Sequence, residues 1–344
     1  MTAAGPENGM AEWISLTHEA PVDPARRIID AHHHLWAEGH RKNPNTYSGG
    51  NEPAYLPANL HADIGKHNVI GSVFVECGVA YRSDGPDHLR AVGETEFVAE
   101  QARLAGGKGP PILGIVADAD IARTDVLEEV LDAHVAAGSG LFVGIRQMPV
   151  GYGRPMRDLL AEPEFRDGIA MLGARGFTFD AMLGYSQLKQ LAEFAPKVAQ
   201  TTLIVDHLGA PNLRPGGPER DAVTAEWKEG IRALMPHGNV VLKIGGIGME
   251  RAFGMNWSQQ ERPPNSDTVV ERWQDEIRFC IDTLGPDRCM FESNYPVDRL
   301  ALGYTVMWNA FQKIAARYSD AEQDALFSGT ACNAYNLRVD GNGD

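Results

Sequence analysis

The sequence predicts an α/β protein with one domain, a distorted (βα)8 barrel of the TIM type. Short apolar runs rich in β-branched residues alternate with longer segments of helical period, which is the pattern of parallel strands joined by crossover helices. The chain has 344 residues, of which 43% are hydrophobic. That length lies just above the usual size of one barrel and allows a full core.

Eight apolar runs are predicted to form strands. They span residues 27–31, 70–76, 112–117, 140–146, 176–181, 202–206, 240–244 and 288–293. Eight strands with helices between them close into a barrel more readily than they form an open doubly wound sheet. No strand is followed by a GxGxxG or Walker loop, so the pattern disfavours a nucleotide-binding sheet.

Helices are expected between these strands. The segments of helical period span residues 94–105, 125–137, 164–174, 187–198, 222–234, 268–284 and 301–317. Thr124 is a start signal for the second helix, and Gly285-Pro286 is a stop signal after the sixth. We therefore expect an extension at 1–26, a barrel domain at 27–338 and a tail at 339–344.

Composition limits the partners and the location. The chain has 46 acidic and 31 basic residues and a formal charge of -15, which opposes binding to nucleic acid or anionic lipid. There is no signal-peptide pattern and no apolar run of membrane-spanning length, so a cytoplasmic location is expected. The four cysteines form no CxxC pair, which favours reduced thiols. The expected partners are a small-molecule substrate and a second copy of the chain.

Two long segments that follow strands are expected at the carboxyl ends of the barrel. They span residues 36–57 and 245–265 and contain several aromatic residues. Long loops at that face commonly cover the substrate. Trp36 and Tyr185, with side chains of the second segment, are candidates for an apolar substrate wall, and burial in the core is the alternative.

The strongest local motif lies at the end of the first strand. It reads Asp30-Ala31-His32-His33-His34-Leu35-Trp36. Alternation along a strand places His32 and His34 on one side and His33 on the other. Two imidazoles on one side can bind the same metal ion, although three histidines could also be solvated or buried in the core.

Later motifs complete a resemblance to a known family. They are Val73-Phe74-Val75-Glu76, Gly144-Ile145-Arg146, Phe179-Asp180, Asp206-His207-Leu208-Gly209, Lys243 and Phe291-Glu292-Ser293-Asn294-Tyr295-Pro296-Val297. In this order, over nearly the whole chain, the sequence resembles the amidohydrolase superfamily. Within it the chain is similar to the amidohydrolase-2 branch, which includes sugar-lactone, pyrone-dicarboxylate and muconolactone hydrolases and some decarboxylases.

The resemblance implies a metal-dependent hydrolase that acts on a lactone, or another cyclic ester or amide, of a small carboxylated compound. It implies metal ligands at His32, His34 and His207, and one divalent ion, with zinc or manganese expected. It also implies an eighth-strand Asp that binds the ion and takes a proton from water. Where lactonase relatives read Gly-Ser-Asp-Trp-Pro, this chain has Asn294 in place of that Asp. An amide accepts no proton near neutral pH and is a weak ligand.

Three compensations for the missing carboxylate remain open. Glu76, ahead of Glu292, could be the base and a metal ligand. His207 could be the base instead of a ligand. The reaction could also need no such base. We expect Glu76, His207 and Asn294 to be catalytic, with Asn294 donating a hydrogen bond to the substrate or the oxyanion. For Glu292 a buried ion pair with Lys243 or Arg146 is equally compatible.

Arg146 is expected to bind a carboxylate of the substrate, because its planar guanidinium suits that group. Asp180 is expected to orient Arg146 or to contact the substrate, and a role as an acid or base is the alternative. Asp298 is expected to cap the helix that follows. The alternative functions are a metal-dependent decarboxylase of an unsaturated or aromatic acid, a lactonase that works without metal, and a non-catalytic barrel subunit.

Overall fold

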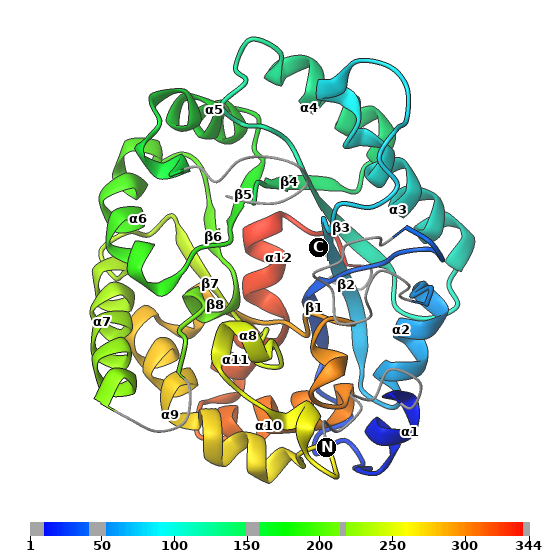
Figure 1. Ribbon diagram of the computed structural model, residues 1–344, viewed down its shortest axis with the longest axis vertical. Helices are drawn as coiled ribbons and strands as arrows, with labels where there is room; N and C mark the ends of the chain where they lie inside the picture. Colours follow the sequence, from blue (N-terminus) through cyan, green and yellow to red (C-terminus); the bar gives the residue numbers. More distant parts are fainter. Residues whose placement is uncertain (1–9, 41–52, 149–157, 214–217, 340–344) are drawn as a thin grey trace, which may run out of the picture.

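Eight parallel strands form one sheet whose order follows the chain (Figure 1). The computed structural model describes residues 10–40, 53–148, 158–213 and 218–339. The strands are β1 (Ile28–His33), β2 (Val69–Val75), β3 (Ile112–Ala117), β4 (Phe142–Arg146), β5 (Thr178–Ala181), β6 (Leu203–Val205), β7 (Val240–Ile244) and β8 (Cys289–Phe291). Each strand pairs in parallel with the next, so the predicted barrel is confirmed.

Helices connect the strands, as the sequence predicts. They are α1 (Met10–Ser15), α2 (Pro57–Ile64), α3 (Val92–Ala105), α4 (Leu127–Gly138), α5 (Pro163–Ala174), α6 (Leu188–Phe194), α7 (Pro218–Leu234), α8 (Glu250–Phe253), α9 (Ser266–Leu284), α10 (Tyr304–Ala315), α11 (Asp320–Asp324) and α12 (Thr330–Tyr335). The helix expected at 187–198 is split, because α6 gives way to a 3-10 turn at Ala195–Val198 that contains Pro196. None of the described helices is long and apolar enough to cross a membrane.

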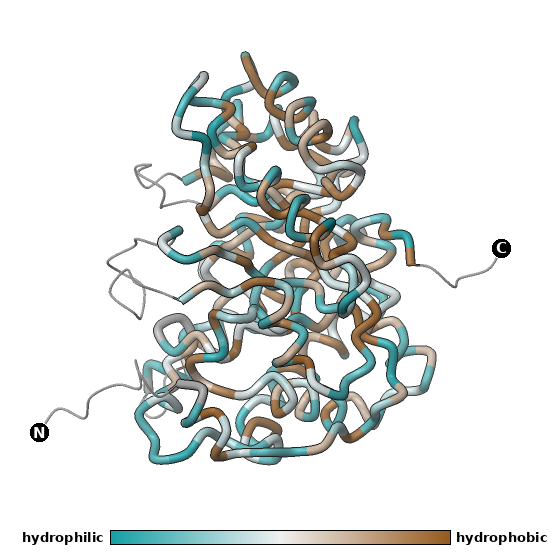
Figure 2. The backbone as a smooth tube through the Cα atoms, turned by 90° about the vertical axis from the view of Figure 1, so that its right-hand side faces the viewer, coloured by the Kyte–Doolittle hydropathy of each residue, from teal (hydrophilic) through white to brown (hydrophobic). Residues whose placement is uncertain are grey.

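Two apolar layers stabilise the barrel. The outer layer lies between strands and helices, where Phe291 of β8 stacks on Phe311 of α10 with ring centroids 4.6 Å apart. The inner layer consists of Ile29, Ala31, Val73, Val75, Val116, Ile204, Val241 and Met290, packed against Ala331 and Tyr335 of α12. Figure 1 shows α12 in the middle of the ring of strands, and Figure 2 shows apolar stretches running through the centre of the molecule. Helix α12 therefore closes one end of the barrel and leaves the carboxyl ends of the strands for the site.

The barrel closes where β1 meets the chain after β8. The His34 amide donates to the Tyr295 carbonyl at 2.7 Å, and the Asn294 amide donates to the His32 carbonyl at 2.8 Å. Below them the buried Asp30 carboxylate accepts hydrogen bonds from the Ser293 amide at 2.8 Å and the Ser293 hydroxyl at 2.6 Å. It also accepts one from the Tyr304 hydroxyl at 3.1 Å. We call this set of contacts the closing seam.

The described part of the N-terminal extension packs against the helices near β8. The Thr17 hydroxyl donates to the Pro263 carbonyl at 2.8 Å, and the Val22 amide donates to the Asn309 side chain at 2.9 Å. These contacts cross about 250 to 290 positions of sequence. They tie the extension to the segment before α9 and to α10.

We predict that Asp30→Ala lowers the free energy of unfolding by about 3 kcal/mol or more, because three buried donors lose their acceptor. Denaturant unfolding followed by circular dichroism measures this change. Asp87→Ala is the control, since the Asp87 side chain is 98% exposed and its loss should change stability by less than about 0.5 kcal/mol. Equal midpoints for the two variants would show that the Asp30 contacts do not stabilise the seam.

Candidate active site

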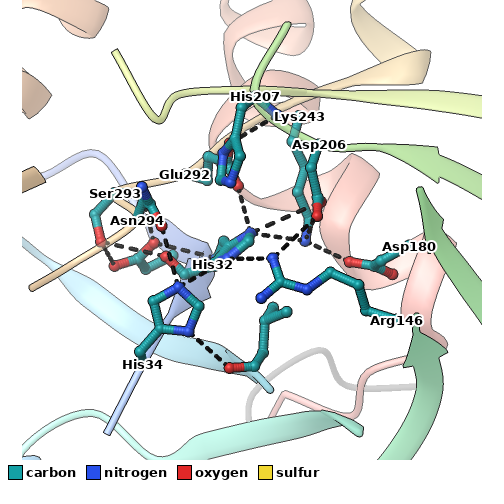
Figure 3. A network of polar contacts seen from close by, with 12 residues as sticks. His32, His34, Arg146, Asp180, Asp206, His207, Lys243, Glu292, Ser293 and Asn294 are labelled. Carbon is teal, nitrogen blue, oxygen red and sulfur yellow. Dashed lines mark hydrogen bonds and ion pairs between the residues drawn. The ribbon is translucent and has the colours of Figure 1, made fainter. Parts of the chain in front are cut away.

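Polar and charged side chains gather inside the ring of strands (Figure 3). They come from β1, β4, β5 and β7 and from the residues that follow β1, β2, β6 and β8. The set is His32, His34, Glu76, Arg146, Asp180, Asp206, His207, Lys243, Glu292 and Asn294, and every member is at most 5% exposed. The residues predicted from distant motifs therefore lie together.

The two outer histidines of the motif at the end of β1 meet in this set. The Nε2 atoms of His32 and His34 lie 3.3 Å apart, and His34 Nδ1 donates to the Val75 carbonyl at 2.8 Å. His33 lies elsewhere, with its ring centroid 6.1 Å from that of Phe74. The pairing of β1 with β2 shifts in register between Asp30 and His33, so alternation along β1 is not strict.

Asp206 and His207 both reach the site, although they are consecutive. His207 has a φ of 53°, which ends the extended strand and turns its imidazole toward His32. The ring centroids of these two histidines are 4.7 Å apart. Gly246 makes room for the ring, because a Cβ atom there would lie 2.5 Å from His207 Nδ1.

Glu292 lies beneath two imidazoles. One oxygen is 2.6 Å from His207 Nδ1, and the other is 2.8 Å from His32 Nδ1. The expected partners were Lys243 or Arg146, so the ion pairs of Glu292 differ from that expectation. Gly245 leaves space for this side chain, since a Cβ atom at Gly245 would lie 2.3 Å from Glu292 Cγ.

Asn294 is held in one orientation. Its Nδ2 donates to Asp298 Oδ1 at 2.8 Å, and Asp298 Oδ2 accepts the Gly248 amide at 2.8 Å. The Asn294 Oδ1 atom therefore faces His34 Nε2, at 3.1 Å. Asp298 does not cap the next helix as expected, but joins the turn after β8 to the loop after β7.

Arg146 is bonded on several sides by the protein. Its Nε donates to a carboxylate oxygen of Glu76 at 2.7 Å, and its Nη2 donates to the Glu76 carbonyl at 2.5 Å. Its Nη1 lies 3.3 Å from an oxygen of Asp206 and 3.4 Å from His32 Nε2. The guanidinium thus neutralises charge next to the histidines.

Lys243 and Asp180 form a second buried ion pair deeper in the barrel. Lys243 Nζ lies 2.5 Å from Asp180 and 3.2 Å from Asp206. The Tyr335 hydroxyl of α12 also donates to Asp180, at 2.7 Å. The expected orientation of Arg146 by Asp180 is therefore replaced by a pair between Asp180 and Lys243.

The site carries excess negative charge. Its four carboxylates, those of Glu76, Asp180, Asp206 and Glu292, face two permanent cations, Arg146 and Lys243. Burial alone would raise the pKa values of Asp206 and Glu292, yet the neighbouring cations and imidazoles hold both below their usual range. Burial, opposed by Lys243, raises the pKa of Asp180 to about 6. A bound divalent cation would balance this charge, and a protonated imidazole would offset half of it.

The histidines respond to this charge in opposite ways. Burial lowers the pKa of His32 to about 4, and Lys243 adds to the effect. Burial also opposes protonation of His207, but Glu292 outweighs it and raises the pKa of His207. His32 is therefore a neutral donor of a lone pair, whereas His207 readily takes a proton.

The geometry fits a divalent ion. Because His34 Nδ1 donates to a carbonyl, His34 Nε2 holds a lone pair, and it faces Asn294 Oδ1, which is another acceptor. In neutral His34 these two acceptors lie 3.1 Å apart, and a shared cation or a proton on Nε2 would stabilise them. Ligand atoms of His32, Asp206 and His207 also lie within 4.8 Å of one another. Nitrogen and oxygen donors of this kind suit zinc or manganese.

The residues expected in an apolar wall pack in the core or at its margin. Trp36 is 4% exposed and donates from Nε1 to the Pro53 carbonyl at 2.8 Å. Tyr185 is partly buried in the 3-10 turn Tyr185–Gln187 after β5. Phe253 and Trp257, in the loop after β7, are buried. Residues 41–52 of the other long segment lie outside the described residues.

Sequence reasoning missed Asp206 and Tyr335 as members of the site. Asp206 belongs to the motif Asp206-His207-Leu208-Gly209, and its place directly after a buried strand is the signal that could have identified it. Tyr335 had none, because α12 is far along the chain from the strands whose interior it enters.

Known proteins are similar to this chain in sequence and fold. A family model described as amidohydrolase matches residues 29–337. The protein y4mH of Sinorhizobium fredii, described as uncharacterized, is 30% identical over 327 residues, covering 90% of this chain and 98% of its own. The L-fucono-1,5-lactonase of Burkholderia multivorans is 25% identical over 312 residues, covering 90% of this chain and 96% of its own. A crystal structure of an amidohydrolase from Burkholderia multivorans with bound zinc has a TM-score of 0.70 at 26% identity and covers 90% of this chain and 99% of that one.

We predict that Arg146→Met lowers the free energy of unfolding by about 3–5 kcal/mol, because it leaves the buried Glu76 carboxylate without its cation. Adding Glu76→Gln should restore part of the loss, since the second change removes that charge. Thermal unfolding of the wild type, the two single variants and the double variant measures the coupling. Strictly additive losses would contradict a stabilising Arg146–Glu76 pair.

Proposed function

Because the chain belongs to the amidohydrolase family, we propose that it is a metal-dependent lactonase that hydrolyses a neutral sugar lactone. The observation that carries this proposal is the convergence of lone pairs at the carboxyl ends of the strands. His32 Nε2, His34 Nε2 and Asn294 Oδ1 lie within 3.3 Å of their neighbours in this group. We assign these three atoms as ligands of one divalent ion, with zinc or manganese as the expected metal.

A bound divalent ion would polarise the lactone carbonyl and lower the pKa of a water molecule. His207 would take the proton from that water, because Glu292 holds its Nδ1 at 2.6 Å and stabilises the imidazolium that forms. Glu76 is less suited to this task, since its carboxylate already accepts a hydrogen bond from the Arg146 guanidinium.

The charges of the site favour a neutral substrate over the carboxylated one expected from the sequence. The guanidinium of Arg146 already contacts Glu76 and Asp206, so it offers little net charge to a further carboxylate. The excess negative charge around it would repel such a group. The fucono-lactonase relative, whose name gives a sugar lactone as substrate, supports this class of substrate.

We predict that the purified protein binds about one equivalent of zinc or manganese and opens neutral aldonolactones, and that a chelator removes this activity. His32→Ala and His34→Ala should each lose metal and activity, because each removes a ligand. A pH-indicator assay on 1,5- and 1,4-aldonolactones and metal analysis measure both properties.

His33→Leu is the matched control for these variants. His33 belongs to the same motif, but neither of its ring nitrogens has a hydrogen-bond partner among the described residues. This variant should keep its metal and its activity. Full activity in metal-free protein, or turnover only of carboxylated lactones or of acids that release carbon dioxide, would contradict the proposal.

His207→Gln should keep the metal while kcat falls by about 10²–10⁴-fold, because the variant lacks the proton acceptor but keeps the three ligand atoms. Metal content and kcat are measured on the same preparation. Loss of the metal along with activity would show that His207 is a ligand and that another group accepts the proton.

A further inference from the structure

Glu292 is placed so that one carboxylate contacts two imidazoles that have different tasks. Its oxygens lie 2.6 Å from His207 Nδ1 and 2.8 Å from His32 Nδ1. The first oxygen also accepts the backbone amide of His207 at 3.2 Å. The side chain is fully buried, so bulk solvent does not reach these contacts.

We infer that Glu292 is the positioning residue that sets the tautomers of His32 and His207 together. An ionised carboxylate only accepts hydrogen bonds, so His207 Nδ1 carries the hydrogen of the 2.6 Å contact, and an oxygen 2.8 Å from His32 Nδ1 favours a hydrogen on that nitrogen as well. Both Nε2 atoms are then left with lone pairs, one to bind the metal and the other to take a proton. This inference rests on the proposed function for the tasks of the two rings, but not for their tautomers.

Lys243 offers a second explanation for the tautomer of His32, and the two explanations predict different tautomers. Its Nζ lies 3.3 Å from His32 Nδ1, and an ammonium group can only donate. If Lys243 determined the tautomer, His32 would carry its hydrogen on Nε2 and could not bind a metal there. The contact of His32 Nδ1 with Glu292 is shorter by 0.5 Å, and Lys243 also donates to Asp180 and lies 3.2 Å from Asp206, so its charge is shared with two carboxylates.

The backbone after β7 leaves room for the side chains of Glu292 and His207. A Cβ atom at Gly245 would lie 2.3 Å from Glu292 Cγ, and one at Gly246 would lie 2.5 Å from His207 Nδ1. Two consecutive glycines after β7 therefore leave the space that the carboxylate and the imidazole occupy. Any side chain at either position would push one of them away.

The test reads the tautomers directly in metal-free protein. Two-bond ¹H–¹⁵N spectra of histidine-labelled wild type, recorded in alkaline buffer, should show Nδ1–H and an unprotonated Nε2 for both His32 and His207. The variants His32→Asn and His207→Gln assign the signals. A wild-type spectrum with the hydrogen on His32 Nε2 would overturn the inference, whether or not any variant folds.

Glu292→Gln should change the tautomer of one of the two imidazoles. The glutamine oxygen can still accept a hydrogen bond from one Nδ1–H, but the glutamine NH2 group can only donate to the other Nδ1. We expect His32 to switch to Nε2–H, since Lys243 also donates to its Nδ1, and we expect zinc affinity to fall by about 10–100-fold. Unchanged tautomers of both rings in a folded Glu292→Gln protein would also overturn the inference.

Asp180→Asn is the matched control, because it removes the same buried charge and its carboxylate contacts Lys243 and Tyr335. It should leave both tautomers unchanged and weaken zinc binding less than Glu292→Gln does. Equal losses of affinity in the two variants would show that charge alone explains the effect of Glu292. Failure of lactone turnover would contradict the proposed function, but it would leave the wild-type spectrum as the test of the tautomers.

Discussion

The closing seam between β1 and the chain after β8 is the contact on which the candidate site depends. It joins residues that are about 260 positions apart, and it is made by backbone hydrogen bonds and the buried Asp30 carboxylate. These bonds place His32 and His34 opposite Asn294. Without the seam, the imidazoles and the amide oxygen would belong to opposite edges of an open sheet.

Buried charge is the second constraint, and it explains why so many side chains take part. A carboxylate inside a barrel is costly unless cations and hydrogen-bond donors surround it. Arg146 meets Glu76 and Asp206, while Lys243 meets Asp180 and Asp206. The remaining negative charge lies next to the imidazoles, where it favours a bound cation and raises the pKa of His207. The buried ion pairs therefore determine how much negative charge remains beside the imidazoles at the carboxyl ends of the strands.

The strands and their order could be predicted because buried parallel strands leave a strong apolar signal, and most helices could be predicted from their period. The gathering of His32, His34, Arg146 and His207 followed from their common place at strand ends. The pairing among charged residues could not be predicted. Which carboxylate meets which cation depends on side-chain reach across the barrel, and Glu292 contacts histidines from two different strands. Asp298 resembled a helix cap locally, and only the tertiary contact with Gly248 shows its other partner.

The amide at Asn294 is better understood together with Asp298 than as a missing acid. Asp298 Oδ1 lies 2.8 Å from Asn294 Nδ2, and burial, opposed mainly by the Gly248 amide, raises the pKa of Asp298 to about 7. An aspartate at position 294 would bring two carboxyl groups to that distance, and they could share the space only with a proton between them. The amide instead donates on one side and accepts on the other. It keeps an oxygen directed at His34, and in the proposed reaction His207, which has its own buried carboxylate, takes the proton instead.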